Sequence, residues 1–303
     1  MTSAADESIA HITSKTPLSP TLNAWKFYLE DQSRSIHTIK AFISDLNLLR
    51  SYLPPDRPIG AITTTEINNF LGWMQNGRGV PCSPKTLSRR ITSIKSFFRW
   101  LQGNGVLLTD PAEKVLQKSV LSPLPEVLSK KEFDAVIDTA EIQKQSKKPD
   151  ARPYCLLSLL LETGIKKGEC LSITLNHIDF DAPGGPLIFV RYANPKHRYK
   201  ERKIVLSDKW LKAYSEYKIQ YDLRDRLFPW SPRRLEYILE DLGKAAGLEK
   251  HLSFLMCRWT SALIDFRAGV DHTKIRQKLG ISEIQWREIK MKLNRLDLAE
   301  TDE

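Results

Sequence analysis

The spacing of apolar residues in the first hundred positions most constrains the fold. Apolar side chains recur there every three or four residues in four successive stretches, which predicts four amphipathic helices. The stretches are Leu22, Trp25, Tyr28 and Leu29; Ile36, Ile39, Phe42, Ile43, Leu46 and Leu49; Ile67, Phe70, Leu71 and Met74; and Leu87, Ile91, Ile94, Phe97, Phe98 and Leu101. The third helix is expected to begin at an N-cap, Thr64 or Thr65. No strand pattern occurs before residue 125, so the first domain is predicted to be a small all-helical bundle.

The second half of the chain combines helical stretches with a short sheet. Alternating side chains over residues 187–192 and an apolar run over 204–206 predict two strands, joined by a basic turn at 193–200. Helices are expected at 129–140, 151–162, 208–221, 232–245, 254–267, 272–279 and 283–296. The pattern as a whole predicts a mainly α protein whose second domain is α+β with a small sheet.

Length and composition predict where the domains begin and end. A chain of 303 residues is long enough for about two domains. Residues 1–16 are polar and rich in Ser and Thr, and are expected to be a disordered tail. Residues 118–127 contain a Ser-Pro-Leu-Pro run that is typical of a stiff linker. The helical domain is therefore expected at 17–117 and the second domain at 128–303.

The charge balance suggests a polyanionic partner. The chain has 46 Lys and Arg against 36 Asp and Glu, a formal net charge of +10, and such an excess is most often met by nucleic acid. Residues 76–100 contain only basic charged residues, namely Arg78, Lys85, Arg89, Arg90, Lys95 and Arg99. A helix with one apolar and one cationic face fits a groove lined by phosphates; the alternative is a solvated basic face. The turn of the predicted hairpin carries a second basic cluster.

Several classes of protein are disfavoured by simple counts. The four cysteines are widely spaced and form no CxxC pair, so neither a zinc site nor a disulfide framework is expected. The longest apolar run, at 155–161, is far shorter than the roughly 20 residues of a membrane span. No secretory signal is visible at the N-terminus. A cytoplasmic protein with no membrane contact and no metal is expected.

Several motifs, taken in order, resemble the tyrosine recombinases, the family of the phage integrases. The resemblance covers about residues 20–296. In the first domain it rests on residues 35–42 (SIHTIKAF), 83–91 (SPKTLSRRI) and 104–112 (NGVLLTDPA). In the second domain it rests on residues 162–171 (ETGIKKGECL), 258–262 (RWTSA), 268–271 (AGVD) and 278–280 (KLG).

The resemblance implies a fold and a chemistry. It implies an N-terminal helical core-binding domain of the SAM-like type, followed by a catalytic-type domain, both on double-stranded DNA. In the family a tyrosine attacks a DNA phosphate, two arginines bind the phosphate oxygens, a hairpin lysine protonates the leaving oxygen and histidines assist. The reaction needs no metal and no ATP, so the resemblance implies no cofactor.

Three of the family's active-site positions keep a positive charge in this sequence. The first arginine position is occupied by Lys166, which lacks the bidentate fork of a guanidinium. The hairpin lysine matches Lys196, with Lys200 as a rival because the turn is one residue longer than usual. The second arginine matches Arg258, which can bind phosphate without chemistry. Nearby, Glu169 matches an acidic residue of the first motif that is expected to be structural.

The other catalytic positions are replaced. Leu255 and Ile281 stand where the family has histidines, and Lys290 stands where it has the nucleophilic tyrosine. The last tyrosine of the chain is Tyr237, so no phenol follows Arg258 and no shift of the alignment can supply one. The resemblance therefore implies a pseudoenzyme, a family member that is not expected to be an enzyme.

Three functional hypotheses remain open at this point. The first is an inactive DNA-binding protein that acts as an accessory or architectural subunit in recombination or integration of a mobile element. The second is an active site-specific recombinase with rearranged chemistry or with a partner's tyrosine, and the third is an interaction protein that binds RNA or acidic partners. The candidate DNA contacts are Lys40, Lys85, Arg89, Arg90, Lys95, Arg99, Lys167, Arg198, Lys200 and Arg202. Expected partners are double-stranded DNA of the nucleoid and either an intact tyrosine recombinase or further copies of the chain.

Overall fold

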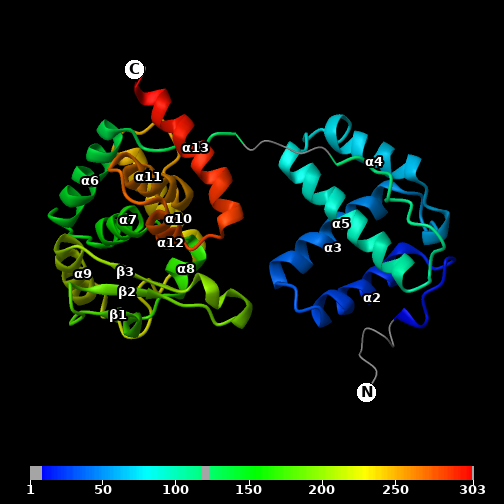
Figure 1. The fold of residues 1–303 in the computed structure, drawn as a ribbon, viewed down its shortest axis with the longest axis horizontal. Coiled ribbons are helices and arrows are strands. Elements are labelled where there is room, and N and C mark those ends of the chain that lie inside the picture. The colour runs from blue at the N-terminus through cyan, green and yellow to red at the C-terminus, as the bar shows by residue number, and fades with distance from the viewer. Residues whose placement is uncertain (1–8, 118–122, 302–303) are drawn as a thin grey trace. The chain divides into compact units, whose positions relative to one another are not determined.

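The chain divides into two compact units. A computed structural model describes residues 9–117 and 123–301, and the side chains of the described residues up to 299. The two units are Met1–Ser122 and Pro123–Glu303 (Figure 1). The division falls inside the stretch that the sequence predicts to be a linker.

The described part of the N-terminal unit is helical, as predicted. Its elements are α2 (Leu18–Asp31), α3 (Ile36–Tyr52), the 3-10 turn η1 (Ile59–Ala61), α4 (Thr64–Asn76) and α5 (Pro84–Gly103). Their apolar faces meet in one core in which Trp25, Phe70 and Phe97 are fully buried. Burial of these large rings is the main source of stability of a small bundle.

Helix α4 begins one residue earlier than predicted. Its N-cap is Thr63, not Thr64 or Thr65. The Thr63 hydroxyl oxygen accepts the backbone N–H of Glu66, and the Glu66 carboxylate accepts the backbone N–H of Thr63. This reciprocal capping box selects the threonine that lies three residues before a glutamate.

Residues 9–16 differ from the expected disordered tail. Ile9 and Ile12 pack partly buried against the N-terminal core. The backbone N–H of Gly60 donates to the carbonyl of Ser14 at 2.8 Å, and a side chain on Gly60 would collide with Ser14. Two apolar residues in a polar segment are enough to dock it. Residues 1–8 of the expected tail lie outside the described residues.

The C-terminal unit packs helices against a small antiparallel sheet. Its helices are α6 (Lys130–Lys144), α7 (Arg152–Thr163), α8 (Lys167–Ser172), α9 (Asp208–Tyr221), α10 (Pro232–Ala245), α11 (Phe254–Arg267), α12 (His272–Leu279) and α13 (Glu283–Thr301). Its strands are β1 (Ile178–Asp179), β2 (Leu187–Val190) and β3 (Arg202–Val205), with the 3-10 turns η2 (Leu175–His177) and η3 (Pro195–Lys200). The strands lie in the order β1-β2-β3, and Ile188 pairs with both Ile178 and Ile204. Together with the N-terminal bundle, this confirms the predicted fold class.

Two short elements were not predicted. Helix α8 has six residues and β1 has two, both too short to show a periodicity. Helix α8 begins where the backbone N–H of Lys166 donates to the carboxylate of Glu169. Both residues belong to the expected site, so the missed helix is the element that positions them.

The C-terminal end of the expected linker, from residue 124 onwards, packs against the C-terminal unit. Leu124 and Val127 pack against the apolar cluster of α11, α12 and α13. The backbone N–H of Leu128 donates to the buried hydroxyl of Thr260 at 2.9 Å. These contacts attach residues 124–128 to the C-terminal unit, while residues 118–122 lie outside the described residues.

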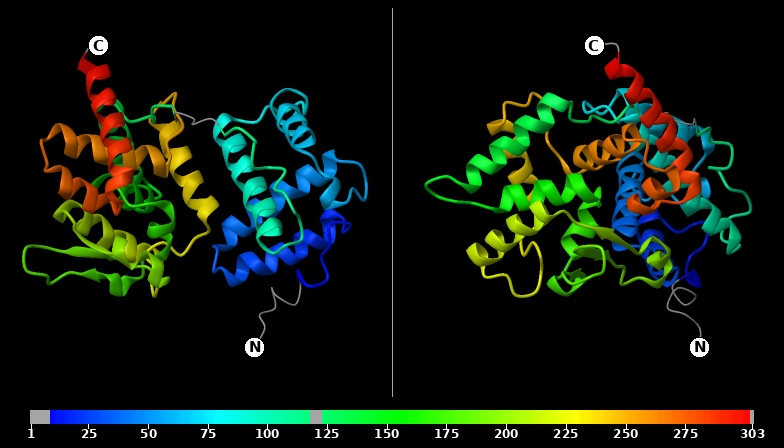
Figure 2. Two further views of the ribbon diagram at one scale, coloured as in Figure 1. Left: turned by 45° about the vertical axis from the view of Figure 1, so that its right-hand side comes forward. Right: turned by 60° about the vertical axis from the view of Figure 1, so that its left-hand side comes forward.

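Helix α13 packs within its own chain. Figure 2 shows it in red beside the preceding helices, and it contacts α11. Leu293 and Trp286 are buried there, while Ile284, Met291 and Leu298 on the same helix are exposed. One face of α13 is thus used inside the unit. In the described part of the chain, no helix has the length and apolar character needed to cross a bilayer.

Candidate functional site

Glu169 is the centre of a hydrogen-bonded cluster in the C-terminal unit. Its buried carboxylate accepts two hydrogen bonds from the guanidinium of Arg202, at 3.1 and 2.9 Å. It also accepts from the phenol of Tyr192 and, at 2.8 Å, from the backbone N–H of Lys166. Burial alone would raise the pKa of Glu169, but these donors and the charge of Arg202 lower it to about 2. The ionised carboxylate therefore ties α8 to β3.

Lys166 lies at the start of α8, next to this cluster. Its ammonium is 4.0 Å from a carboxylate oxygen of Glu169, and its side chain is 41% exposed. Partial burial lowers the pKa of Lys166 to about 8; Glu169 opposes this shift, while Arg258, Lys200 and Arg202 add to it. Because Arg202 is already paired with Glu169, Arg258 and Lys200 are the positive charges beside Lys166 that favour an anion here.

Arg258 on α11 joins two helix ends. Its guanidinium donates to the carbonyl oxygens of Gly164 and, at 2.7 Å, of Leu279. Gly164 ends α7 in the left-handed conformation with φ of 58°, and Leu279 is the last residue of α12. Burial lowers the pKa of Arg258 to about 10. Two of its five N–H groups are used in this way, and within the described residues no other hydrogen bond from the guanidinium is present.

A groove of about 980 Å³ brings Lys166 and Arg258 together with α10. Arg233 and Tyr237 on α10 line it, and Nε of Arg233 donates to the phenol oxygen of Tyr237 at 2.7 Å. His251 also lines this groove. Sequence reasoning placed neither Tyr237 nor His251 at the site, because only the tertiary fold brings α10 and the segment after it to Lys166 and Arg258.

The replaced catalytic positions are dispersed. Leu255 lines the same groove and is 62% exposed, which is unusual for leucine. Ile281 is buried in the apolar cluster of α11–α13, and Lys290 is half-buried on α13. Neither Ile281 nor Lys290 lines the groove of Lys166.

The hairpin between β2 and β3 carries Lys196, Arg198 and Lys200 on η3. Lys196 and Arg198 are exposed, and the backbone N–H of Lys196 donates to the side chain of Asn194 at 2.9 Å. Lys200 is half-buried, and its charge is among those that lower the pKa of Lys166. Lys200 therefore lies within electrostatic reach of the groove.

Arg202 was expected to contact DNA, but its side chain is enclosed within the C-terminal unit. Its side chain is only 7% exposed, and besides Glu169 its guanidinium binds the carbonyls of Lys278 and Lys200, at 2.6 and 3.1 Å. A guanidinium so enclosed is unavailable to DNA. Lys167, another expected contact, is half-exposed and pairs with Glu236 at 2.6 Å.

The basic helix α5 is only partly available to a ligand. Arg89 and Arg90 both pair with the buried Asp45 on α3, and Nη1 of Arg90 also lies 3.1 Å from the sulfur of Cys82. Arg90 is buried, so it holds the bundle together instead of facing DNA. The Lys95 ammonium donates to the carbonyl of Glu113 at 3.2 Å. Among the expected DNA contacts of the N-terminal unit, Lys40, Lys85 and Arg99 are exposed.

Possible metal ligands do not cluster in the described residues. No group of three or more His, Cys, Asp and Glu side chains there has the proximity needed to hold an ion. Cys155, Cys170 and Cys257 are buried and unpaired, and burial raises the pKa of each thiol.

Comparison with known proteins identifies the family. Residues 126–289 match the phage integrase family, and residues 22–105 match the N-terminal SAM-like domain of phage integrases. The chain therefore belongs to the phage integrase family, whose members include the tyrosine recombinases. This agrees with the family that the sequence motifs predict.

Relatives of similar length are tyrosine recombinases. XerC of Lacticaseibacillus casei (strain BL23) is 25% identical over 279 residues, which cover 88% of this chain and 91% of the relative. XerD of Listeria innocua serovar 6a is 23% identical over 295 residues, which cover 90% and 94%.

Solved structures share the fold. The XerH site-specific recombinase in a post-cleavage complex with a palindromic difH substrate superposes with a TM-score of 0.72 and 17% identity, over 98% of this chain and 87% of that one. A lambda integrase tetramer on a Holliday junction gives 0.71 and 17%, over 93% and 80%. At these identities the similarity concerns the fold.

Proposed function

We propose that this protein is a DNA-binding member of the phage integrase family that does not cleave DNA. It would act in the cytoplasm on nucleoid DNA, as an accessory or architectural subunit in recombination or integration of a mobile element. One observation carries the proposal: the groove keeps the cations Lys166 and Arg258, whereas no tyrosine follows Tyr237. That relatives are named recombinases and solved neighbours hold DNA supports duplex DNA as the ligand.

The groove suits phosphate binding better than phosphate chemistry. Lys166 is a point charge and cannot bind two phosphate oxygens through a fork as arginine does. Leu255 has no group that transfers a proton, and Ile281 is apolar and buried. Cations that remain where the family's phenol and imidazoles are replaced can position DNA without cleaving it.

The first test is a suicide-substrate assay, in which a nicked duplex traps any covalent protein–DNA intermediate. Purified protein is expected to form no adduct, and the adduct is measured by denaturing gel electrophoresis. An intact tyrosine recombinase on its own substrate serves as the positive control. A covalent adduct formed by this protein on any duplex tested would refute the inactive assignment.

The second test concerns DNA affinity. Replacing Lys40, Lys85 and Arg99 by alanine is expected to weaken duplex binding at least about tenfold, and to reduce the slope of log K against log salt by about 3. These three cations are exposed on the N-terminal unit. Binding is measured by fluorescence anisotropy over a salt series.

The matched control removes three exposed lysines of α9, Lys209, Lys212 and Lys218, and is expected to change affinity less than threefold. Equal losses in the two triple variants would show a general charge effect without a defined surface. Absence of duplex binding by the unchanged protein would favour an interaction protein for RNA or acidic partners.

A specific observation favours a second candidate function, an active recombinase with rearranged chemistry. The Tyr237 phenol lies in the same groove as Arg258 and accepts a hydrogen bond from Arg233. If the suicide substrate traps an adduct that Tyr237→Phe abolishes, this tyrosine is the nucleophile. If an adduct with an added intact tyrosine recombinase forms on a duplex that neither protein cleaves alone, the partner supplies the phenol.

A further inference from the structure

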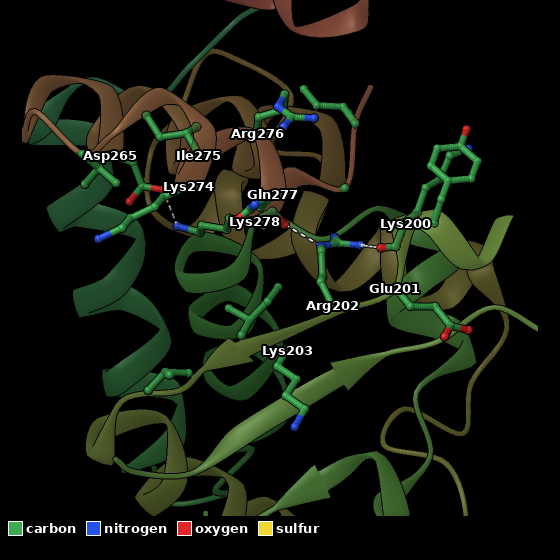
Figure 3. Close-up of a pocket in the computed structure, with 16 residues that line it drawn as sticks. Lys200, Glu201, Arg202, Lys203, Asp265, Lys274, Ile275, Arg276, Gln277 and Lys278 are labelled. Carbon is green, nitrogen blue, oxygen red and sulfur yellow. Dashed lines mark hydrogen bonds and ion pairs between the residues drawn. The ribbon is translucent and has the colours of Figure 1, made fainter. Parts of the chain in front are cut away.

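A second cavity, of about 740 Å³, lies between β3 and α12 (Figure 3). It is separate from the groove of Arg258, and cations dominate its lining. The lining contains six Lys and Arg residues, namely Lys200, Arg202, Lys203, Lys274, Arg276 and Lys278, and two carboxylates, Glu201 and Asp265. By residue count the lining has four more positive than negative charges, and Glu169, outside the lining, neutralises one of them by pairing with Arg202.

Two of these cations are neutralised by partners within the unit. Arg202 is paired with Glu169, and the ammonium of Lys278 lies 2.7 Å from the carboxylate of Asp265. Figure 3 shows Lys278 reaching towards Asp265 and Arg202 towards the backbone of Lys278 and Lys200. These pairs build the walls of the cavity.

Lys274 and Arg276 on α12 have no such partner. Lys274 is exposed and Arg276 half-buried, and no ion pair of either side chain occurs in the part of the chain that the structure describes. Lys274 lies four residues before Lys278, whose positive charge is offset by Asp265. The helix His272–Leu279 contains no carboxylate of its own. An anion bound here would supply a counter-charge to Lys274 and Arg276.

The opposite wall contributes Lys200 and Tyr199 from the hairpin. The Lys200 ammonium lies 5.0 Å from the centre of the Tyr199 ring, and Tyr199 is exposed. In Figure 3 Lys200 and Arg276 lie on different elements at the rim of one cavity. Positive side chains from α12 and from the hairpin thus line the same cavity.

We propose that this cavity is a second anion site, which binds phosphate groups through Lys274, Arg276 and Lys200. A guanidinium and two ammonium groups offer many N–H donors, which suits the several oxygens of a phosphate chain. The phosphates come either from a free polyphosphate or nucleotide or from a nucleic-acid backbone. The site does not depend on the proposed function, because it requires only an anion.

The test compares two double variants that each lose two positive charges. Lys274→Ala/Arg276→Ala alters the cavity, and Lys209→Ala/Lys212→Ala alters the exposed face of α9. Binding of sodium triphosphate is measured by isothermal titration calorimetry at low salt, and binding of a 20-base-pair duplex by anisotropy. The cavity variant is expected to bind triphosphate at least tenfold more weakly, and the α9 variant within twofold of the unchanged protein.

The outcomes separate the two sources of phosphate. Loss of triphosphate binding with duplex affinity equal to that of the α9 variant assigns the site to a free phosphate compound. Loss of duplex affinity beyond the α9 variant assigns it to the DNA backbone. The proposal is overturned if neither ligand distinguishes the two variants. Failure of the proposed function is a different result, namely no duplex binding by the unchanged protein.

Discussion

Replacement of Glu169 by alanine is expected to lower the free energy of unfolding of the C-terminal unit by about 3–5 kcal/mol. The buried guanidinium of Arg202 would lose its carboxylate partner, and the phenol of Tyr192 would lose its acceptor. A charge left buried without a partner costs far more than the loss of an exposed ion pair. The start of α8 would also lose the carboxylate that accepts the N–H of Lys166.

The loss is measured by urea denaturation, with hydrogen exchange of peptides from α8 and β3 to locate it. The control is Glu249→Ala, because Glu249 is an exposed glutamate of the same unit. The control is expected to change stability by less than about 0.5 kcal/mol. Equal effects in the two variants would contradict the role assigned to Glu169.

The same carboxylate predicts a pH dependence. The pKa of Glu169 is lowered from 4.5 to about 2, so its ionisation stabilises the folded unit above pH 4.5. This contribution, about 3 kcal/mol, is lost as the pH falls from 4.5 to 2. Glu169→Ala is expected to flatten the acid limb of the stability curve. An unchanged limb would show that other groups govern acid unfolding.

Replacement of Asp45 by alanine is expected to destabilise the N-terminal unit by about 3 kcal/mol. The buried carboxylate of Asp45 accepts the Ser93 hydroxyl at 2.8 Å and pairs with Arg89 and Arg90 on α5. Its removal leaves the buried Arg90 without a counter-charge and detaches α3 from α5.

Hydrogen exchange of α3 and α5 reports this loss. Asp31→Ala, at an exposed position of α2, is the control and is expected to be close to neutral. If Asp45→Ala leaves α5 as protected as the control does, the ion pairs do not hold the bundle. A retained fold with lower duplex affinity would instead assign Asp45 to orienting Arg89.

The helices could be predicted from the sequence because their cause is local. The expected ranges 208–221, 232–245, 254–267 and 272–279 coincide with α9, α10, α11 and α12. Each range has a periodic apolar face of two turns or more, bounded by residues such as Ser231 and Gly280 that cap its ends. Where an element is shorter than two turns, as in α8, the pattern is too short to read.

The roles of individual cations could not be predicted in this way. Arg90 and Arg202 are basic residues in basic segments, and sequence reasoning assigned both to DNA. Their partners Asp45 and Glu169 lie 45 and 33 positions away, and only the tertiary fold brings the opposite charges together. The sequence shows whether a side chain is positively or negatively charged, but it does not show which opposite charge lies nearest in the fold.

Some residues that line the groove were expected from the sequence, and others were not. Lys166 and Arg258 line one groove, as the family resemblance implies. Tyr237 lies in that groove although it precedes Arg258 in the chain, and no motif marked it. Its position follows from the packing of α10, whose Glu236 pairs with Lys167.

The two carbonyl contacts of Arg258 give this residue a structural role that does not depend on DNA. It links the end of α7 to the end of α12, so its loss would weaken the framework whether or not the protein reacts with anything. The presence of Arg258 is therefore compatible with an active site and with an inactive one, because its two carbonyl contacts are needed in both.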